Sequence, residues 1–150
     1  EVWVDGYGID ENGSLVGYDF GPLAEQEILH GGAKSMPFRY DNTGAMYAEA
    51  EQTFDKTQDW TEYGVENLVL YFYGDTTNTG SPQLYVKING TKIAYDGAAT
   101  DLQTAAWHTW PINLASTGVN VKKITTLAIG IEGSGATGIL YFDDISLTTP

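Results

Sequence analysis

The chain has 150 residues, which is enough for one domain whose hydrophobic core needs no covalent cross-link. Its 7 Lys plus Arg stand against 20 Asp plus Glu, a formal net charge of −13. This charge argues against binding to nucleic acid or to anionic membranes, because both need clustered basic residues. The sequence contains no cysteine, which excludes disulfides and thiolate metal sites, and no apolar run approaches the about 20 residues of a membrane helix.

Aromatic residues make up 13% of the chain and there are 18 glycines, a composition that favours sheet and turns over helix. Residues 5–22 are rich in glycine and acids and predict a long loop with at most one strand. Period-two alternation then predicts strands, in chain order, at 34–40, 46–54, 68–73, 83–88, 91–95, 107–114, 126–132 and 138–147. Asn89-Gly90 predicts a two-residue hairpin turn. The spacing, without a βαβ rhythm, favours an all-β antiparallel sandwich or jelly roll formed by residues 1–150 as one domain.

The alternation also assigns faces to each strand. It predicts that Tyr71 and Tyr73 point outward from one strand, Tyr85 from the next, and the small residues Ala128 and Gly130 from a later one. We expect a shallow groove with Ala128 and Gly130 as its floor and the three tyrosines as its walls. Sugars bind such surfaces because their C–H faces stack on aromatic rings. The alternative is that outward tyrosines only pair with neighbours across the sheet.

Catalysis has weak support in the sequence. Glu49 and Glu51 alternate on one face of a predicted strand, about 7 Å apart, which a glycosidase could use, but acids are abundant and such pairs arise by chance. Arg39 is the only arginine, so a lyase acting on uronic acids lacks the cations it needs. No Gly-x-Ser-x-Gly elbow and no cysteine nucleophile are present. We therefore expect a protein without enzymatic activity.

Asp143-Asp144 lies inside an otherwise apolar strand near the end of the chain. Whichever carboxylate points inward needs a partner that offsets its desolvation. A calcium ion bound by hard oxygen ligands is one such partner, and neighbouring backbone amides are another.

Four segments together resemble the galactose-binding-like carbohydrate-binding modules, and in particular modules of the family 4, 9 and 22 type. The segments follow one another in the order seen in that family: His30-Gly31-Gly32-Ala33-Lys34-Ser35-Met36, then Asp59-Trp60-Thr61 with Leu68-x-Leu70-x-Phe72, then Trp107-x-x-Trp110-x-Ile112-x-Leu114, then residues 138–147 with Tyr141-Phe142-Asp143-Asp144-Ile145. The resemblance covers about residues 30 to 147. It implies a β-jelly-roll sandwich and non-catalytic glycan binding.

The resemblance also implies one structural calcium ion. Carried over by position, Asp143 or Asp144 would bind the metal, with backbone near Gly32 and Lys34 as further partners. The early Phe-Glu ligand segment of the family is not evident in this chain.

Glycans in this family bind either on the concave sheet or at the loops of one end. By resemblance, Tyr71, Tyr73 and Tyr85 match outward positions on concave-sheet strands. Trp107 would flank the groove, while Arg39 and Glu49 would offer polar contacts. Trp60 and Trp110 are assigned to the core.

We therefore expect a secreted bacterial module, monomeric and tethered to a glycoside hydrolase or lyase domain, that binds a neutral polysaccharide or oligosaccharide. The chain opens with Glu1-Val2-Trp3 rather than a basic and then apolar leader, so we expect a mature domain cut from a longer protein. We expect neither nucleic-acid binding nor membrane insertion. The alternative function is a structural or protein-interaction sandwich of a surface or secreted multidomain protein, with its tyrosines in an interface.

Overall fold

The computed structural model of the chain describes residues 3–16, 28, 30–31 and 35–150. The strands of this part of the chain are β1 (Trp3–Val4), β2 (Ser14–Val16), β3 (Met36–Asp41), β4 (Tyr47–Gln58), β5 (Asn67–Tyr73), β6 (Gln83–Ile88), β7 (Thr91–Ala94), β8 (Trp107–Asn113), β9 (Ile124–Glu132) and β10 (Thr137–Thr148). Three short 3-10 helices lie between them, η1 (Glu62–Gly64), η2 (Ala99–Gln103) and η3 (Leu114–Ser116). None of the helices in the described residues is long and apolar enough to cross a membrane.

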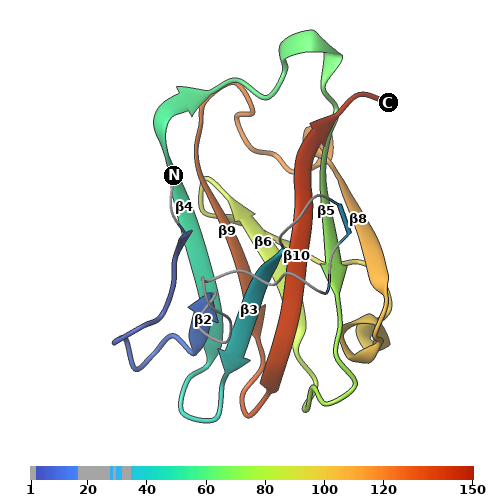
Figure 1. Cartoon of the computed structure of the whole chain (residues 1–150). Helices are drawn as coiled ribbons and strands as arrows, with labels where there is room; N and C mark the ends of the chain where they lie inside the picture. The colour runs from blue at the N-terminus through green and yellow to red at the C-terminus, as the bar shows by residue number, and fades with distance from the viewer. Residues whose placement is uncertain (1–2, 17–27, 29, 32–34) are drawn as a thin grey trace.

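The strands form two five-stranded sheets that pack face to face. Sheet A has the order β1-β4-β9-β6-β7, and sheet B has the order β2-β3-β10-β5-β8. All the strand pairs within the two sheets are antiparallel. Figure 1 shows β3, β10, β5 and β8 in front of β9 and β6. The prediction of an all-β antiparallel sandwich is confirmed.

The core lies between the sheets and uses the alternate residues that the sequence pattern assigned to it. On β5, Leu68, Leu70 and Phe72 are each no more than 2% exposed. The aliphatic residues of β6 and β9 are buried in the same cluster, as are Trp60 and Trp110. Burial of alternate positions on both sheets is what stabilises a two-layer fold, because each sheet has only one face to remove from water.

The hairpin between β6 and β7 turns at Asn89-Gly90, as predicted. Both residues have positive φ, 50° and 80°, which an Asn-Gly pair tolerates at little cost. The tight turn fixes the register, so that Lys87 lies directly opposite Lys92 and Tyr85 opposite Ala94.

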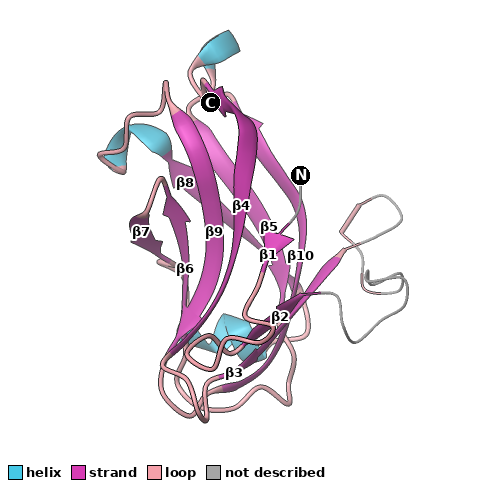
Figure 2. Cartoon of the chain, turned by 90° about the vertical axis from the view of Figure 1, so that its left-hand side faces the viewer, coloured by secondary structure: helices cyan, strands magenta, loops and turns pink. Residues whose placement is uncertain are grey.

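The two sheets curve in the same sense. Figure 2 views the sandwich from its side and shows β9 bowed toward β10 and β5. The outer surface of sheet A is therefore concave, and the outer surface of sheet B is convex. These two surfaces are called the concave face and the convex face below.

Candidate functional site

The structure divides the predicted glycan contacts between the two outer faces. Tyr71 and Tyr73 point outward from β5 and Trp107 from β8, so all three belong to the convex face of sheet B. Tyr85 lies on β6, in sheet A. The predicted groove walled by the three tyrosines and floored by Ala128 and Gly130 is therefore wrong. The physical reason is the connection between β5 and β6, which crosses from one sheet to the other instead of joining two neighbouring strands.

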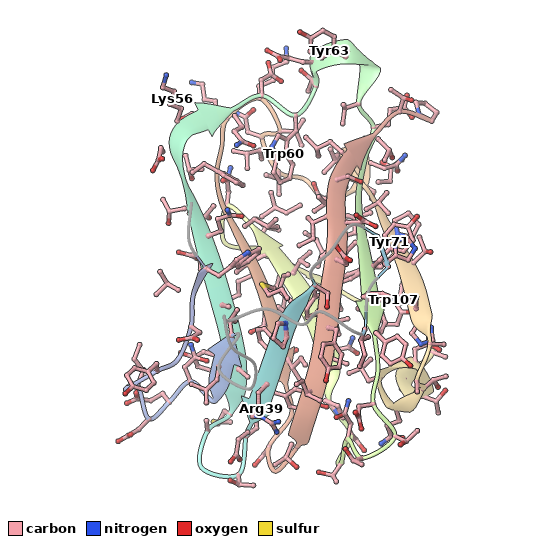
Figure 3. All side chains as sticks on the ribbon, viewed as in Figure 1. Arg39, Lys56, Trp60, Tyr63, Tyr71 and Trp107 are labelled. Atoms are coloured by element: carbon pink, nitrogen blue, oxygen red, sulfur yellow. The ribbon has the colours of Figure 1, made fainter. Side chains whose placement is uncertain are left out.

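The rings of the convex face pack on one another. Tyr73 contacts Trp107 edge to face, with ring centroids 5.5 Å apart, and Tyr141 in the same way at 6.2 Å. His30 stacks on Tyr71 at 3.7 Å and meets Trp107 at 5.4 Å. Figure 3 shows Tyr71 and Trp107 close together beside β5 and β8. One ring face of Tyr71 is thus taken by a histidine of the same chain.

Arg39, the arginine predicted to contact the glycan, lies apart from Tyr71 and Trp107. Arg39 is exposed on β3, where it pairs in register with Ile139 of β10. Figure 3 places it near the lower end of the sheet, away from Tyr71 and Trp107. Arg39 therefore shares the outer face of sheet B with Tyr71 and Trp107 but lies at a distance from both.

Asp143 and Asp144 attach residues 30 and 31 to β10. The Oδ2 atom of Asp143 accepts hydrogen bonds from the backbone N–H groups of His30, at 3.1 Å, and Gly31, at 3.2 Å. Its Oδ1 atom accepts from the N–H of Asp144 at 2.8 Å. The Nδ1 atom of His30 lies 2.6 Å from Oδ2 of Asp144.

The contacts of Asp143 are those of a cap on backbone amides, and calcium binding stays a prediction. Three N–H groups point at the Asp143 carboxylate, and a cation there would need oxygen lone pairs directed at itself instead. Within the described residues, no group of three or more His, Cys, Asp or Glu is placed to hold a metal ion. The amide-capping alternative describes Asp143 better. Gly32 and Lys34, the other predicted partners of calcium, lie outside the described residues.

The concave face is built around Tyr85. Its ring lies across Gly130 of β9, and a Cβ atom added at position 130 would collide with that ring. The phenol oxygen donates a hydrogen bond to Oε1 of Glu49 on β4, at 2.9 Å. Three neighbouring strands thus supply one arrangement: a carboxylate from β4, a bare backbone from β9 and a flat ring from β6.

Cations and carboxylates surround this ring. Lys87 Nζ lies 2.9 Å from the same Glu49 oxygen, and Lys92 Nζ lies 2.7 Å from Oε2 of Glu132. The two ammonium groups lie 5.8 Å and 4.6 Å from the centre of the Tyr85 ring. Burial, and after it the Glu49 carboxylate, raises the pKa of the Tyr85 phenol well above its usual range. The phenol therefore remains a hydrogen-bond donor throughout the physiological range.

Glu49 and Glu51 do lie on the same outer face of β4, as the alternation predicts, opposite Gly130 and Ala128 of β9. Glu49 is occupied by Tyr85 and Lys87. A carboxylate with these partners is positioned to orient a ring and a cation. Because Tyr85 is 1% exposed, what the face offers chemically is the set of charged groups around its ring, with the ring itself beneath them.

Sequence reasoning missed three members of this site, Lys87, Lys92 and Glu132. Lys87 lies two residues after Tyr85, so alternation puts both on one face of β6, but which strands flank β6 is not encoded in β6 itself. The Asn89-Gly90 turn was the available signal for Lys92, because a two-residue loop sets Lys87 and Lys92 opposite each other. For Glu132 no local signal exists.

A second concavity lies at one end of the sandwich, where glycans also bind in the family that the sequence resembles. It has a volume of about 610 Å³ and lies between residues 6–15 and 41–45. Tyr7 is 72% exposed there, and Asp10 and Asp41 are also in its lining. The Thr43 hydroxyl and N–H bind the Asp41 carboxylate and lower its pKa.

The sequence matches no known protein family and no curated protein. Solved structures, in contrast, resemble the fold along nearly the whole chain. The family 11 carbohydrate-binding module of Clostridium thermocellum, in complex with a β-1,3-1,4-mixed-linked tetrasaccharide, has a TM-score of 0.59 at 12% identity, with 99% of this chain and 88% of that one covered. CBM27-1 of Caldicellulosiruptor saccharolyticus, in complex with mannohexaose, has a TM-score of 0.58 at 13% identity, covering 96% and 94%.

An exo-β-agarase structure has a higher TM-score, 0.65 at 10% identity. All of this chain is covered, but only 25% of the agarase chain. The protein therefore has the β-sandwich fold of carbohydrate-binding modules. Similarity at this level of identity establishes the fold alone, and assignment to the family 4, 9 or 22 type remains a prediction.

Proposed function

We propose that the chain is a non-catalytic carbohydrate-binding module that binds a neutral polysaccharide along the concave face of sheet A. The observation that carries this proposal is the Tyr85 ring fixed flat over Gly130 with Glu49, Lys87, Lys92 and Glu132 around it. The Tyr85 ring is 1% exposed, so it becomes a stacking surface for a sugar only when the side chains over it move. The charged side chains at its rim offer hydrogen bonds to hydroxyl groups directly. A concave sheet leaves room for an extended glycan chain.

The charge of the face favours a neutral ligand. Three carboxylates, Glu49, Glu51 and Glu132, are present on it with two ammonium groups, and both ammonium groups are already paired. A polyanionic glycan would meet net negative charge locally and a chain with a net charge of −13. A small stacking site with few hydrogen bonds predicts dissociation constants from about micromolar to millimolar.

The proposal also covers the domain to which the module is attached and where the protein is located. The chain corresponds to about a quarter of the exo-β-agarase chain that shares its fold. This supports a module tethered to a glycoside hydrolase, with a lyase as the other option, in a secreted bacterial protein. The module itself would be monomeric.

Two variants that each remove one cation test the location of the site. Lys87→Met removes a charge from the concave face, and Arg39→Met removes one from the convex face. Affinity electrophoresis in gels containing mixed-linkage β-glucan, mannan or agarose measures retention of each variant and of the parent chain. We expect retention in at least one gel, weakened by about tenfold in Lys87→Met through loss of a charged hydrogen bond and unchanged in Arg39→Met.

The opposite pattern, weakening in Arg39→Met alone, would move the site to the convex face. Unchanged mobility of the parent chain in every gel would contradict glycan binding and favour the structural or protein-interaction function. Release of reducing sugar that Glu49→Gln abolishes would contradict the non-catalytic assignment.

A further inference from the structure

The Tyr85 ring is covered on both sides. Its inner face rests on Gly130, where a side chain would collide with it. Above its outer face lies the ammonium group of Lys92, with Nζ 4.6 Å from the ring centroid. The whole residue is 1% exposed. A sugar that stacks on Tyr85 must therefore take the position that Lys92 holds.

The contact that holds Lys92 in place is weak. Its partner is Glu132, across the sheet on β9, at 2.7 Å, and the two side chains are 43% and 40% exposed. Ion pairs this exposed contribute little to stability, because water solvates both charges once they separate. Separating Lys92 from Glu132 therefore costs little free energy.

The placement of Lys92 is also not one that folding favours. It lies directly opposite Lys87 in the β6–β7 register, and like charges in that position repel. Lys87 also approaches the same ring, with Nζ 5.8 Å from the centroid. Two ammonium groups converge on one tyrosine although the hairpin would be more stable with opposite charges.

We propose that Lys92 is a latch over the sugar-stacking surface of Tyr85. In the latched state Lys92 covers the ring and is held by Glu132. A glycan binds when Lys92 moves away and its C–H face replaces the ammonium group. The latch rests on the proposed function, and it makes Lys92 a residue that determines affinity at that site. Because only the open fraction is competent to bind, the latch lowers the apparent affinity by that fraction.

The latch is tested by removing it. Lys92→Ala takes the nearer ammonium group away from the ring and leaves Lys87 in place. Lys122→Met removes one exposed lysine charge from a loop outside the concave face and serves as the matched control. Calorimetric titration with the oligosaccharide of whichever glycan retains the parent chain gives the association constants. We expect Lys92→Ala to raise the association constant about three- to tenfold, since a weak ion pair and one cation–π contact no longer compete. Lys122→Met should leave it unchanged.

Glu132→Gln provides a second route if Lys92→Ala is poorly folded, as judged by circular dichroism. It keeps the lysine but frees it from its anchor, and should raise affinity in the same direction by a smaller factor. An unchanged or lowered association constant in folded Lys92→Ala overturns the latch, the latter because Lys92 would then be a direct contact, while glycan binding by the parent chain stands. Absence of binding by the parent and by both variants overturns the proposed function and the latch with it.

Discussion

The concave and convex faces both carry tyrosines at outward strand positions, and they differ in what those tyrosines contact. On the convex face, four aromatic rings pack against one another or against His30. On the concave face, Tyr85 lies across a glycine and is surrounded by charged side chains. The tyrosines of both faces come from the same alternating pattern. What an outward ring contacts is decided by the strands on either side of it.

The largest expected difference between the faces is in stability. Tyr85→Ala removes a ring that is 1% exposed and should lower the free energy of unfolding by about 3 kcal/mol, because a cavity is left over Gly130. Tyr71→Ala removes a half-buried ring and should cost about 1 kcal/mol. Urea denaturation measures both. Equal losses would mean that the two rings are equally part of the packing and would remove the distinction drawn above.

Alkaline pH should act on the buried phenols of both sheets. Burial, with the Asp75 carboxylate as a smaller cause, raises the pKa of Tyr40 to about 12, and burial likewise raises the pKa of Tyr85. The folded state holds the Tyr40 proton more tightly than the unfolded state does. The free energy of unfolding is therefore at its full value below the unfolded-state pKa of about 10, and it falls as the pH rises through the folded-state pKa of about 12. The loss for Tyr40 is about 3 kcal/mol.

Unfolding free energies at pH 8, 10, 11 and 12 measure this loss, and Tyr40→Phe should make the profile less steep, with the contribution of Tyr85 remaining. The Tyr40 hydroxyl has no hydrogen-bond partner among the described residues, so the phenylalanine should cost little at neutral pH. A profile that stays flat in the parent chain would show that Tyr40 ionises without penalty.

The smallest expected effect concerns the convex face and calcium. Asp143→Ala removes the acceptor for three backbone N–H groups and should lower the free energy of unfolding by about 1–2 kcal/mol. This loss should be the same with calcium or with a chelator present, and the melting temperature of the parent chain should change by less than about 1 °C between the two. Thermal denaturation in both buffers measures this. A melting temperature that rises by several degrees when calcium is added would support a calcium site at Asp143 or Asp144.

The sequence predicted the layers of the fold better than the site. Alternation along β5, β6 and β9 identified the inward residues, because burial on one face of a strand leaves a period-two pattern in that strand. The Asn89-Gly90 turn identified a strand pairing, since turn chemistry is local. Trp60 and Trp110 were likewise placed in the core.

The prediction of the site failed where it depended on which strands pair with one another. Tyr71 and Tyr85 are only 14 residues apart, yet they lie on opposite outer surfaces, because the segment between β5 and β6 changes sheet. Glu49 and Glu132 reach Tyr85 and Lys92 through pairings of β4 with β9 and β9 with β6, which join segments distant in sequence. No local pattern encodes such pairings.

The edge position of β7 has a further consequence. An edge strand presents unpaired backbone N–H and C=O groups, which can pair with a strand of another molecule. Lysine or proline residues on the edge strand discourage this pairing. Sheet A ends at the four-residue β7, which carries Lys92, and sheet B ends at β8, where Pro111 removes one N–H donor. At two of the four sheet edges, β7 and β8, the chain therefore carries a residue that discourages strand addition from another copy.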